Sequence, residues 1–163
     1  MSRTTAYMEQ INEQIDITLQ KARQLNEATI RWKPADNVWS IMEILCHVEE
    51  IIPYWLNELS NVVKSPGASW GRGLDHPARL EAVAAADSRS VAEVLQGIEA
   101  SKQIVNSAFS SMSDADLDIE SPHRNPKFGV KPMTFLIDHF LVQHLTNHNQ
   151  QIDRDIQLYK DRG

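Results

Sequence analysis

The amino-acid sequence predicts an all-α protein, folded as one four-helix bundle with a long loop between the second and the third helix. Three observations lead to this prediction. Four segments carry apolar residues at the spacing of an amphipathic helix. Turn residues separate these segments, and no stretch shows the apolar–polar alternation of a strand. At 163 residues the chain can bury a core of its own, so we expect a single domain over residues 1–163.

The first helix is expected from Thr5 to about Ala28. Its apolar stripe consists of Met8, Ile11, Ile15, Leu19, Ala22 and Leu25. These positions recur every three or four residues, which is the period of one helix face. The segment WKPADNVWS, residues 32–40, then interrupts the pattern with a proline and two residues typical of turns.

The second helix is expected to start at Ser40, because Ser40 and Glu43 have the spacing of a capping box. The apolar face that follows consists of Ile41, Ile44, Leu45, Val48, Ile51, Ile52, Trp55 and Leu59. Pro53 lies inside this helix and removes one backbone donor, which predicts a kink.

A long connection runs from Lys64 to Asp87, and its first half, SPGASWGRG, is rich in turn residues. Connections of this length are often functional. Pro77 suits the first position of a short helix that runs to about Ala86. Ser90 and Glu93 repeat the capping-box spacing and start the third helix, whose apolar stripe extends to Met112.

A second surface loop is expected between Ser113 and Lys131, where prolines and a glycine exclude a long regular element. Pro132 is suited to the first position of the fourth helix, which should run to about Tyr159. Its apolar stripe consists of Met133, Leu136, Ile137, Phe140, Leu141, Leu145, Ile152 and Ile156. In such a bundle, sites are built from side chains on facing helices.

Composition narrows the class of protein. Asp and Glu outnumber Lys and Arg by 22 to 16, and no basic run offers a footprint for phosphates, so we expect no nucleic-acid partner. No apolar run approaches the roughly 20 residues of a membrane span, and the first residues do not resemble a signal peptide. We therefore expect a cytoplasmic protein without a membrane anchor. Cys46 is the only cysteine, which excludes an internal disulfide and a cysteine-rich zinc site.

Three histidines form the candidate site. His144 and His148 stand four apart and share a face of the fourth helix with its apolar stripe. For an isolated pair at this spacing, the alternative is two ordinary core histidines satisfied by carbonyls or carboxylates. His47 lies between Ile44 and Ile51 beside the apolar face of the second helix. Three inward imidazoles on two helices favour a shared metal ion with an open coordination position.

The remaining histidines are excluded from this set. His139 points about 140° away from His144 around an ideal helix, at 100° per residue. His76 and His123 fall in loops, and His76 is the more plausible of the two as a further ligand. Cys46 points about 100° away from its neighbour His47, which predicts a buried and inert thiol.

Four other residues could act near the site. Trp70 lies in a glycine-flanked loop, where it could cover the site as a lid or pack at the periphery. Glu43, Glu50 and Gln151 have helical spacing to the histidines and could accept a ring N–H from one of them. Capping or solvent exposure explains the two glutamates equally well.

The sequence resembles the DinB-like (DinB/YfiT) superfamily over nearly its whole length. RWKPADNVWS is similar to the family segment that ends in Trp-Ser before the second helix. IMEILCHV is similar to its metal-bearing helix, with His47 in the ligand position, and HLTNHNQQI is similar to its closing H-x-x-x-H signature. The resemblance implies a four-helix bundle, a three-histidine site for zinc or nickel and, frequently, a homodimer. Characterised members include thiol transferases that use bacillithiol or glutathione and a mycothiol-dependent isomerase.

One departure from the family pattern concerns charge. Arg and Gly commonly follow the last histidine in the family, whereas this chain has Asn149 and Gln150. A cation at this position, which could hold an acidic cofactor, is therefore missing. Arg72, Arg79 and Arg124 in the loops could supply positive charge instead.

Three functions are compatible with this site. In the first, the metal holds a small thiol cofactor deprotonated and presents it to an electrophilic small-molecule substrate, as a thiol S-transferase does. In the second, metal-bound water attacks a carbonyl or similar centre, which makes the protein a hydrolase with a carboxylate base near the metal. In the third, the bundle binds the ion or a ligand without turnover. We favour the transferase because the resemblance covers known thiol users and no carboxylate base stands out.

Overall fold

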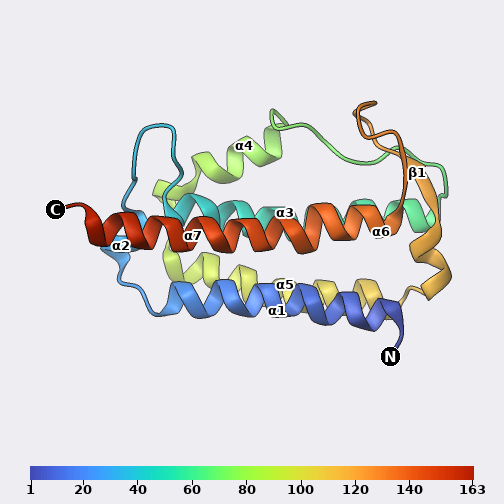
Figure 1. Cartoon of the computed structure of the whole chain (residues 1–163), viewed down its shortest axis with the longest axis horizontal. Coiled ribbons are helices and arrows are strands. Elements are labelled where there is room, and N and C mark those ends of the chain that lie inside the picture. Colours follow the sequence, from blue (N-terminus) through green and yellow to red (C-terminus); the bar gives the residue numbers. More distant parts are fainter.

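The computed structural model describes residues 1–163, and four long helical segments dominate it (Figure 1). They are α1 (Arg3–Arg23), α3 (Ile41–Lys64), α5 (Val91–Ser110), and a composite last helix of α6 (Met133–Leu136), the π-helical turn η3 (Ile137–Val142) and α7 (Gln143–Asp161). The predicted all-α four-helix bundle is confirmed. None of the helices combines the length and the apolar character needed to cross a membrane.

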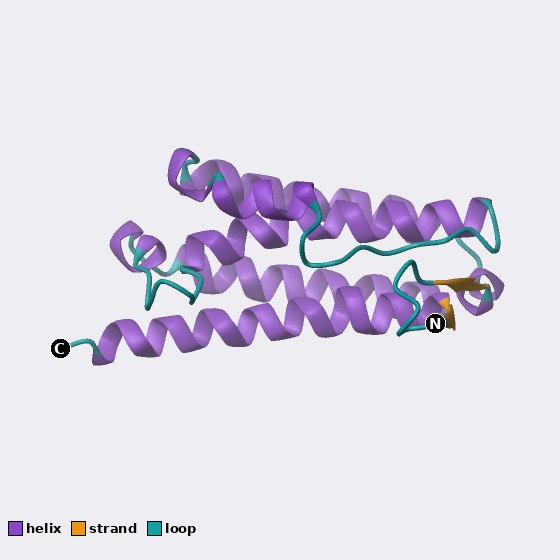
Figure 2. Ribbon diagram, turned by 90° about the horizontal axis from the view of Figure 1, so that it is seen from above, coloured by secondary structure: helices purple, strands orange, loops and turns teal.

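The order of the helices around the bundle explains the long connection. α1 packs against α5 and α7, and α3 packs against the same two, so α1 lies diagonally opposite α3, and α5 lies diagonally opposite α7. α3 and α5 run in the same direction, and the chain must therefore return along the full length of α3 before α5 can start (Figures 1 and 2). This return carries α4 (Pro77–Ala84) and the 3₁₀ turn η1 (Ala86–Ser88).

Two predicted helix starts are borne out by their caps. The Ser40 hydroxyl accepts a hydrogen bond from the Glu43 N–H, and the Glu43 carboxylate accepts one from the Ser40 N–H, which completes the capping box of α3. The Ser90 hydroxyl likewise accepts from the Glu93 N–H at the start of α5. The Glu93 carboxylate pairs with Arg89 instead of closing the box.

The first predicted helix was too long. α1 ends at Arg23, and the next five residues of helix form a separate element, α2 (Glu27–Arg31). Asn26 separates them, because its side chain accepts a hydrogen bond from the Thr29 N–H and caps α2 in an extended conformation.

The second loop contains regular structure that the sequence pattern did not predict. A 3₁₀ turn, η2 (Asp114–Asp118), precedes two short antiparallel strands, β1 (Glu120–Pro122) and β2 (Val130–Pro132). Three residues are too few for a detectable alternation. Pro132 ends β2 and caps α6, so it precedes the last helix and does not open it. Both strands lie at the end of the bundle where the chain begins (Figure 2).

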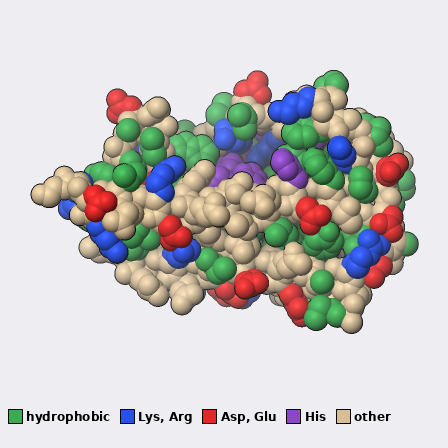
Figure 3. All heavy atoms as spheres, viewed as in Figure 1, with side chains coloured by type: hydrophobic (Ala, Val, Ile, Leu, Met, Phe, Trp, Pro, Cys, Tyr) green, Lys and Arg blue, Asp and Glu red, His purple; other side chains and the backbone are tan.

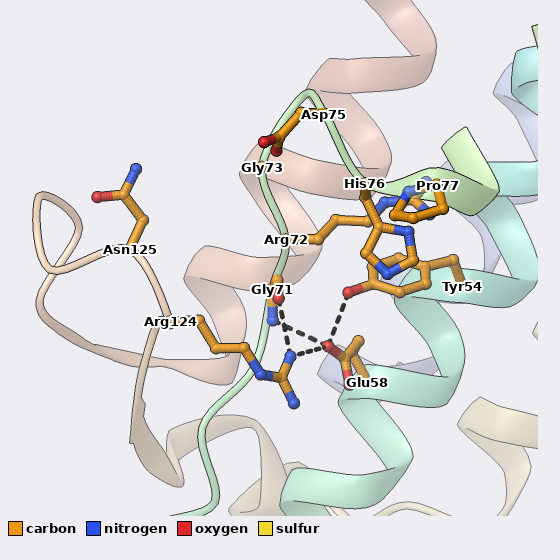
Figure 4. A pocket seen from close by; sticks show the side chains of 10 residues that line it. All are labelled: Tyr54, Glu58, Gly71, Arg72, Gly73, Asp75, His76, Pro77, Arg124 and Asn125. Carbon is orange, nitrogen blue, oxygen red and sulfur yellow. Dashed lines mark hydrogen bonds and ion pairs between the residues drawn. The ribbon is translucent and has the colours of Figure 1, made fainter. Parts of the chain in front are cut away.

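The long connection is tied to the second loop and to α3. The Trp70 backbone exchanges hydrogen bonds with Pro122 and Arg124 across the two loops. The Glu58 carboxylate, buried on α3, accepts from the Gly71 N–H, the Arg124 guanidinium and the Tyr54 hydroxyl (Figure 4). These contacts hold the connection over the face of the bundle that α3 and α7 form.

Gly71 allows the closest of these approaches. Its φ is +92°, and a Cβ at this position would lie 2.2 Å from the His123 Nε2 atom. Only glycine fits here without moving the buried His123 ring.

Candidate metal centre

Three imidazoles converge between α3 and α7. The structure brings His47 of α3 together with His144 and His148 of α7, and one ring nitrogen of each lies within 4.8 Å of the others. His47 and His148 are buried, and His144 is half-buried. Figure 3 shows histidine side chains in a hollow on this face, with basic side chains beside them. The three residues singled out in the sequence therefore share one place in the fold.

Hydrogen bonds orient two of the rings. The Oε1 atom of Gln151 accepts from Nδ1 of His148 at 2.8 Å, and the carbonyl oxygen of Phe140 accepts from Nδ1 of His144 at 3.2 Å. Both acceptors assign the proton to Nδ1, which leaves a lone pair on Nε2. This is the usual way in which metal-binding histidines are held. The role considered for Gln151, as acceptor of a ring N–H, is thus observed.

Two ring nitrogens of these histidines have no partner within the protein. Nε2 of His148 and Nδ1 of His47 are buried and make no hydrogen bond. A buried polar atom without a partner costs stability. A divalent cation bound through one ring nitrogen of each histidine would supply a partner where the protein offers none, so the donor set fits a metal ion.

The protonation state of the three rings suits the same purpose. Burial is the main cause that lowers the pKa of His47 to about 2 and that of His144 to about 3, and it also lowers the pKa of His148. The positive charge of Arg79 lowers the pKa of all three further. The imidazoles are therefore neutral near pH 7, as a metal ligand must be.

A small cavity of about 120 Å³ opens onto the histidines. Its wall contains apolar and aromatic residues together with Arg72 and Arg79, and no Asp or Glu contributes to it. Glu50, which was considered as a partner for His47, binds Arg72 instead; its Oε2 lies 2.7 Å from Nη1 of Arg72. The Arg72 guanidinium also stacks 3.8 Å from the ring centroid of Tyr54.

Glu43 was the other carboxylate considered as a partner for His47, and this interpretation is wrong. Its carboxylate accepts from the Ser40 N–H and from Lys33, at the start of α3. Hydrogen bonds to these two donors lower its pKa although burial opposes them.

The histidines excluded in the sequence lie outside the centre. The ring of His139 stacks on Phe135 with centroids 5.2 Å apart, and His76 caps α4 by accepting from the Ala78 N–H. His123 is buried against Trp70 and Phe140. Cys46 is buried, as predicted, and burial raises the pKa of its thiol to about 11.

Trp70 is a core residue, and the two interpretations offered from the sequence were both wrong. Its side chain is fully buried, and its indole N–H donates to the carbonyl oxygen of Ser121 at 2.9 Å. It packs against Trp55, His123 and Phe140. Sequence gave no signal for this burial, because its partners come from other segments.

The position after the last histidine faces α1 and not the centre. Asn149 is buried, and its side chain bonds to Thr18 and Gln14. Of the three loop arginines considered as substitutes, Arg72 and Arg79 line the histidine cavity, whereas Arg124 pairs with Glu58.

Comparisons with known proteins agree with this architecture. The DinB superfamily matches residues 10–152. Among solved structures, YfiT from Bacillus subtilis is similar, with a TM-score of 0.79 and 11% sequence identity over 96% of this chain and 89% of that one. YfiT is described as a probable metal-dependent hydrolase with an unusual four-helix bundle topology. A search among curated proteins found no match.

Proposed function

The chain belongs to the DinB superfamily, and we propose that it binds one zinc or nickel ion through His47, His144 and His148 to activate the thiol of a small cofactor. Support for the metal comes from the convergence of the three rings, each with one nitrogen within 4.8 Å of the others, and from the buried, unpaired nitrogens of His47 and His148. When bound, a divalent ion among neutral imidazoles supplies uncompensated positive charge that favours a thiolate over a thiol.

The absence of a carboxylate in the wall of the cavity carries the choice of thiol transfer over hydrolysis. A hydrolase needs a base near the attacking water, but no Asp or Glu lines the cavity, and Glu50 of α3 is held by Arg72. Two arginines in the wall instead favour anionic ligands.

In the proposed reaction the cofactor sulfur attacks an electrophilic carbon of the substrate. A carbon–sulfur bond forms, the carbon–halogen bond of an alkyl halide breaks, and halide leaves with the bonding electrons. The thiol proton passes to solvent. The aromatic wall formed by Trp55 and Phe140 excludes water from the apolar part of the substrate.

Metal-dependent hydrolysis is the second candidate. It is favoured by the similarity of fold to YfiT, which is described as a probable metal-dependent hydrolase. At 11% identity this similarity is evidence for the fold alone. We prefer thiol transfer because no Asp or Glu lines the cavity.

Metal analysis and a paired assay test the proposal. Protein purified without an affinity tag or added metal should carry zinc or nickel near one per chain, and His148→Ala should lose it while His139→Ala keeps it. The assay offers bacillithiol, mycothiol, glutathione and coenzyme A with a chlorinated or epoxide electrophile, beside a panel of esters and amides. Thiol conjugation that disappears in His148→Ala supports the transferase.

Two results would overturn parts of this proposal. Ester hydrolysis without thiol, lost in His148→Ala, would replace the transferase by a hydrolase and leave the metal site intact. Unchanged metal content in His47→Ala, His144→Ala and His148→Ala would reject the site itself. For a thiol that ligates the ion, cobalt-substituted protein should gain a sulfur-to-metal absorption band.

A further inference from the structure

Apart from Arg162 at the C-terminal end of the chain, Arg79 is the only arginine that forms no ion pair with a carboxylate. Of the nine arginines, seven form an ion pair with Asp or Glu, and the other two are Arg79 and Arg162. Arg162 lies two residues from the end of the chain, over the ring of Tyr159. In a protein of net charge −6, a half-buried guanidinium without an acidic partner needs an explanation.

The position of Arg79 on α4 places it beside the histidines. It lines the histidine cavity, and its charge acts on all three imidazoles, whose pKa values it lowers in addition to the larger effect of burial. Its guanidinium carbon lies 5.3 Å from the ring centroid of Trp39. Its only hydrogen bond in the structure goes from Nη1 to the carbonyl oxygen of Leu74, at 2.8 Å. The Nε–Nη2 edge is therefore free.

A second cleft of about 290 Å³ adjoins the histidine cavity on this side. Arg79 and His148 belong to both walls, and Asn37, Trp39, Gln151 and Arg154 are among the residues that complete the cleft. No Asp or Glu lines it. Arg154 uses Nε and Nη2 to bind Asp155, so the guanidinium of Arg79 is the group in this wall that has no counter-charge.

We propose that Arg79 binds a carboxylate of the small-molecule ligand, in the cleft between α4, the Trp39 segment and α7, while the reacting group of the same ligand lies at the three histidines. The free Nε–Nη2 edge matches the two oxygens of a carboxylate, which guanidinium groups bind in this bidentate manner. Trp39 supports the flat face of the guanidinium.

This inference rests on the proposed function and narrows it to one class of ligand. The thiol cofactor or its acceptor carries a carboxylate a few atoms from the reacting centre. Arg79 is a specificity-determining residue in this arrangement, and it takes no part in the chemical step.

A series of small thiols tests the inference. Cobalt-loaded protein is titrated with mercaptoacetate, 3-mercaptopropionate and 4-mercaptobutyrate, and with the neutral 2-mercaptoethanol, while the sulfur-to-metal band is recorded. Arg79→Gln should weaken the best-fitting acid by about tenfold, as expected for loss of a charge-assisted hydrogen bond. The same variant should change the affinity for 2-mercaptoethanol by less than about twofold, which is too small a difference for a lost hydrogen bond.

Two further variants make the comparison specific. Arg162→Gln removes the other arginine that has no carboxylate partner and should change neither class of thiol. Arg79→Lys keeps the charge and loses the bidentate edge, so the acids should bind with intermediate affinity. If Arg79→Gln fails to fold or to load metal, the ratio between acid and neutral thiol in Arg79→Lys decides the same question. An equal change for acids and 2-mercaptoethanol would overturn the inference.

A separate measurement distinguishes failure of this inference from failure of thiol transfer. If no thiol produces the band in the unmodified protein, thiol ligation is rejected, and zinc-loaded protein is titrated with succinate by calorimetry. A roughly tenfold weaker binding by Arg79→Gln keeps the carboxylate subsite. Equal binding by both proteins, or no binding by the unmodified protein at millimolar succinate, rejects the subsite.

Discussion

Two regions of this molecule bury histidine, and they use it differently. At the centre, His47, His144 and His148 direct ring nitrogens at one another between α3 and α7. In the aromatic cluster at the other side of Phe140, His123 lies face to face with that phenylalanine and edge-on to Trp70. Its Nδ1 accepts from the Asn125 N–H, and its Nε2 is buried without a partner.

This comparison shows that burial of a histidine is not enough to indicate a metal site, because several ring nitrogens must also lie close together. His123 has a pKa lowered by burial and an unpaired nitrogen, as His47 and His148 of the centre do. It is surrounded by the rings of Trp70, Phe128 and Phe140, which offer no further metal ligand. An unpaired buried nitrogen indicates a metal site only where several such atoms lie within reach of one ion.

The largest expected effect is therefore on metal affinity. His47→Ala should lose most of the bound metal, a larger effect than the roughly 10- to 100-fold that follows from disturbing a residue that only orients a ligand. His123→Ala should keep near one ion per chain and lose about 3 kcal/mol of unfolding free energy through the cavity it leaves. Metal analysis and urea unfolding measure the two. Loss of metal from His123→Ala would contradict the distinction between His123 and the three histidines of the centre.

The pH dependence of stability is the next largest effect, and it concerns metal-free protein. Because the folded pKa values of His47 and His144, about 2 and about 3, lie below the unfolded value of 6.5, the unfolded chain binds protons first as the pH falls. The stability that the neutral rings contribute is thus fully present above the unfolded pKa of 6.5, and it is lost progressively as the pH falls below this value. Proton uptake by these two residues in the unfolded chain should lower the free energy of unfolding by about 3 kcal/mol between about pH 7.5 and about pH 5.5.

Denaturant unfolding in the presence of a chelator measures this loss. His148 and His123 act in the same direction, since burial lowers the pKa of each. His47→Leu cannot take up a proton, so the pH-dependent loss should shrink by about 1.4 kcal/mol. A stability that does not change with pH over this range would contradict the buried, neutral state of the rings.

A smaller effect is expected from Gln151, which orients His148 through a hydrogen bond to Nδ1. Gln151→Ala should weaken metal binding about 10- to 100-fold and leave the stoichiometry at saturation unchanged. Gln157→Ala is the matched control, because Gln157 lies on the same helix and is exposed, with bonds only to Asp161. Competition with a fluorescent chelator gives both affinities. Equal values for the two variants would reject the orienting role.

The smallest effect concerns Cys46, the direct neighbour of His47 in sequence. Burial raises the pKa of its thiol to about 11, so the reactive thiolate is scarce near pH 7. A thiol-specific reagent should therefore label it only after unfolding, and Cys46→Ala should keep its metal. Rapid labelling of native protein would show that the protein's own thiol can compete with a cofactor.

The contrast between the two regions also shows what the sequence can predict. His47, His144 and His148 lie on long amphipathic helices, where the apolar stripes of α3 and α7 determine which way each ring points. Spacing along the chain was enough to bring them together. Trp70 and His123 lie in loops, and their burial depends on each other and on Phe140, which local patterns do not encode.

Arg79 stands between these cases. Its presence in a loop segment and its charge were visible in the sequence, but not its lack of a carboxylate partner. That property follows from the way seven other arginines pair, and pairing depends on the packing of the whole bundle.

The π-helical turn at residues 137–142 changes the angular relation between the two ends of the last helix. Its wider turn, closed by a hydrogen bond from the Gln143 N–H to the Asp138 carbonyl, holds one residue more than an α-helical turn. One residue corresponds to about 100° of rotation about the helix axis. The side chains of α6 are therefore rotated by about this angle relative to where a continuous α-helix with α7 would place them. A one-residue deletion in this turn would restore the α-helical period, so it should turn Met133 and Leu136 away from the core if the histidines are to keep their direction toward α3.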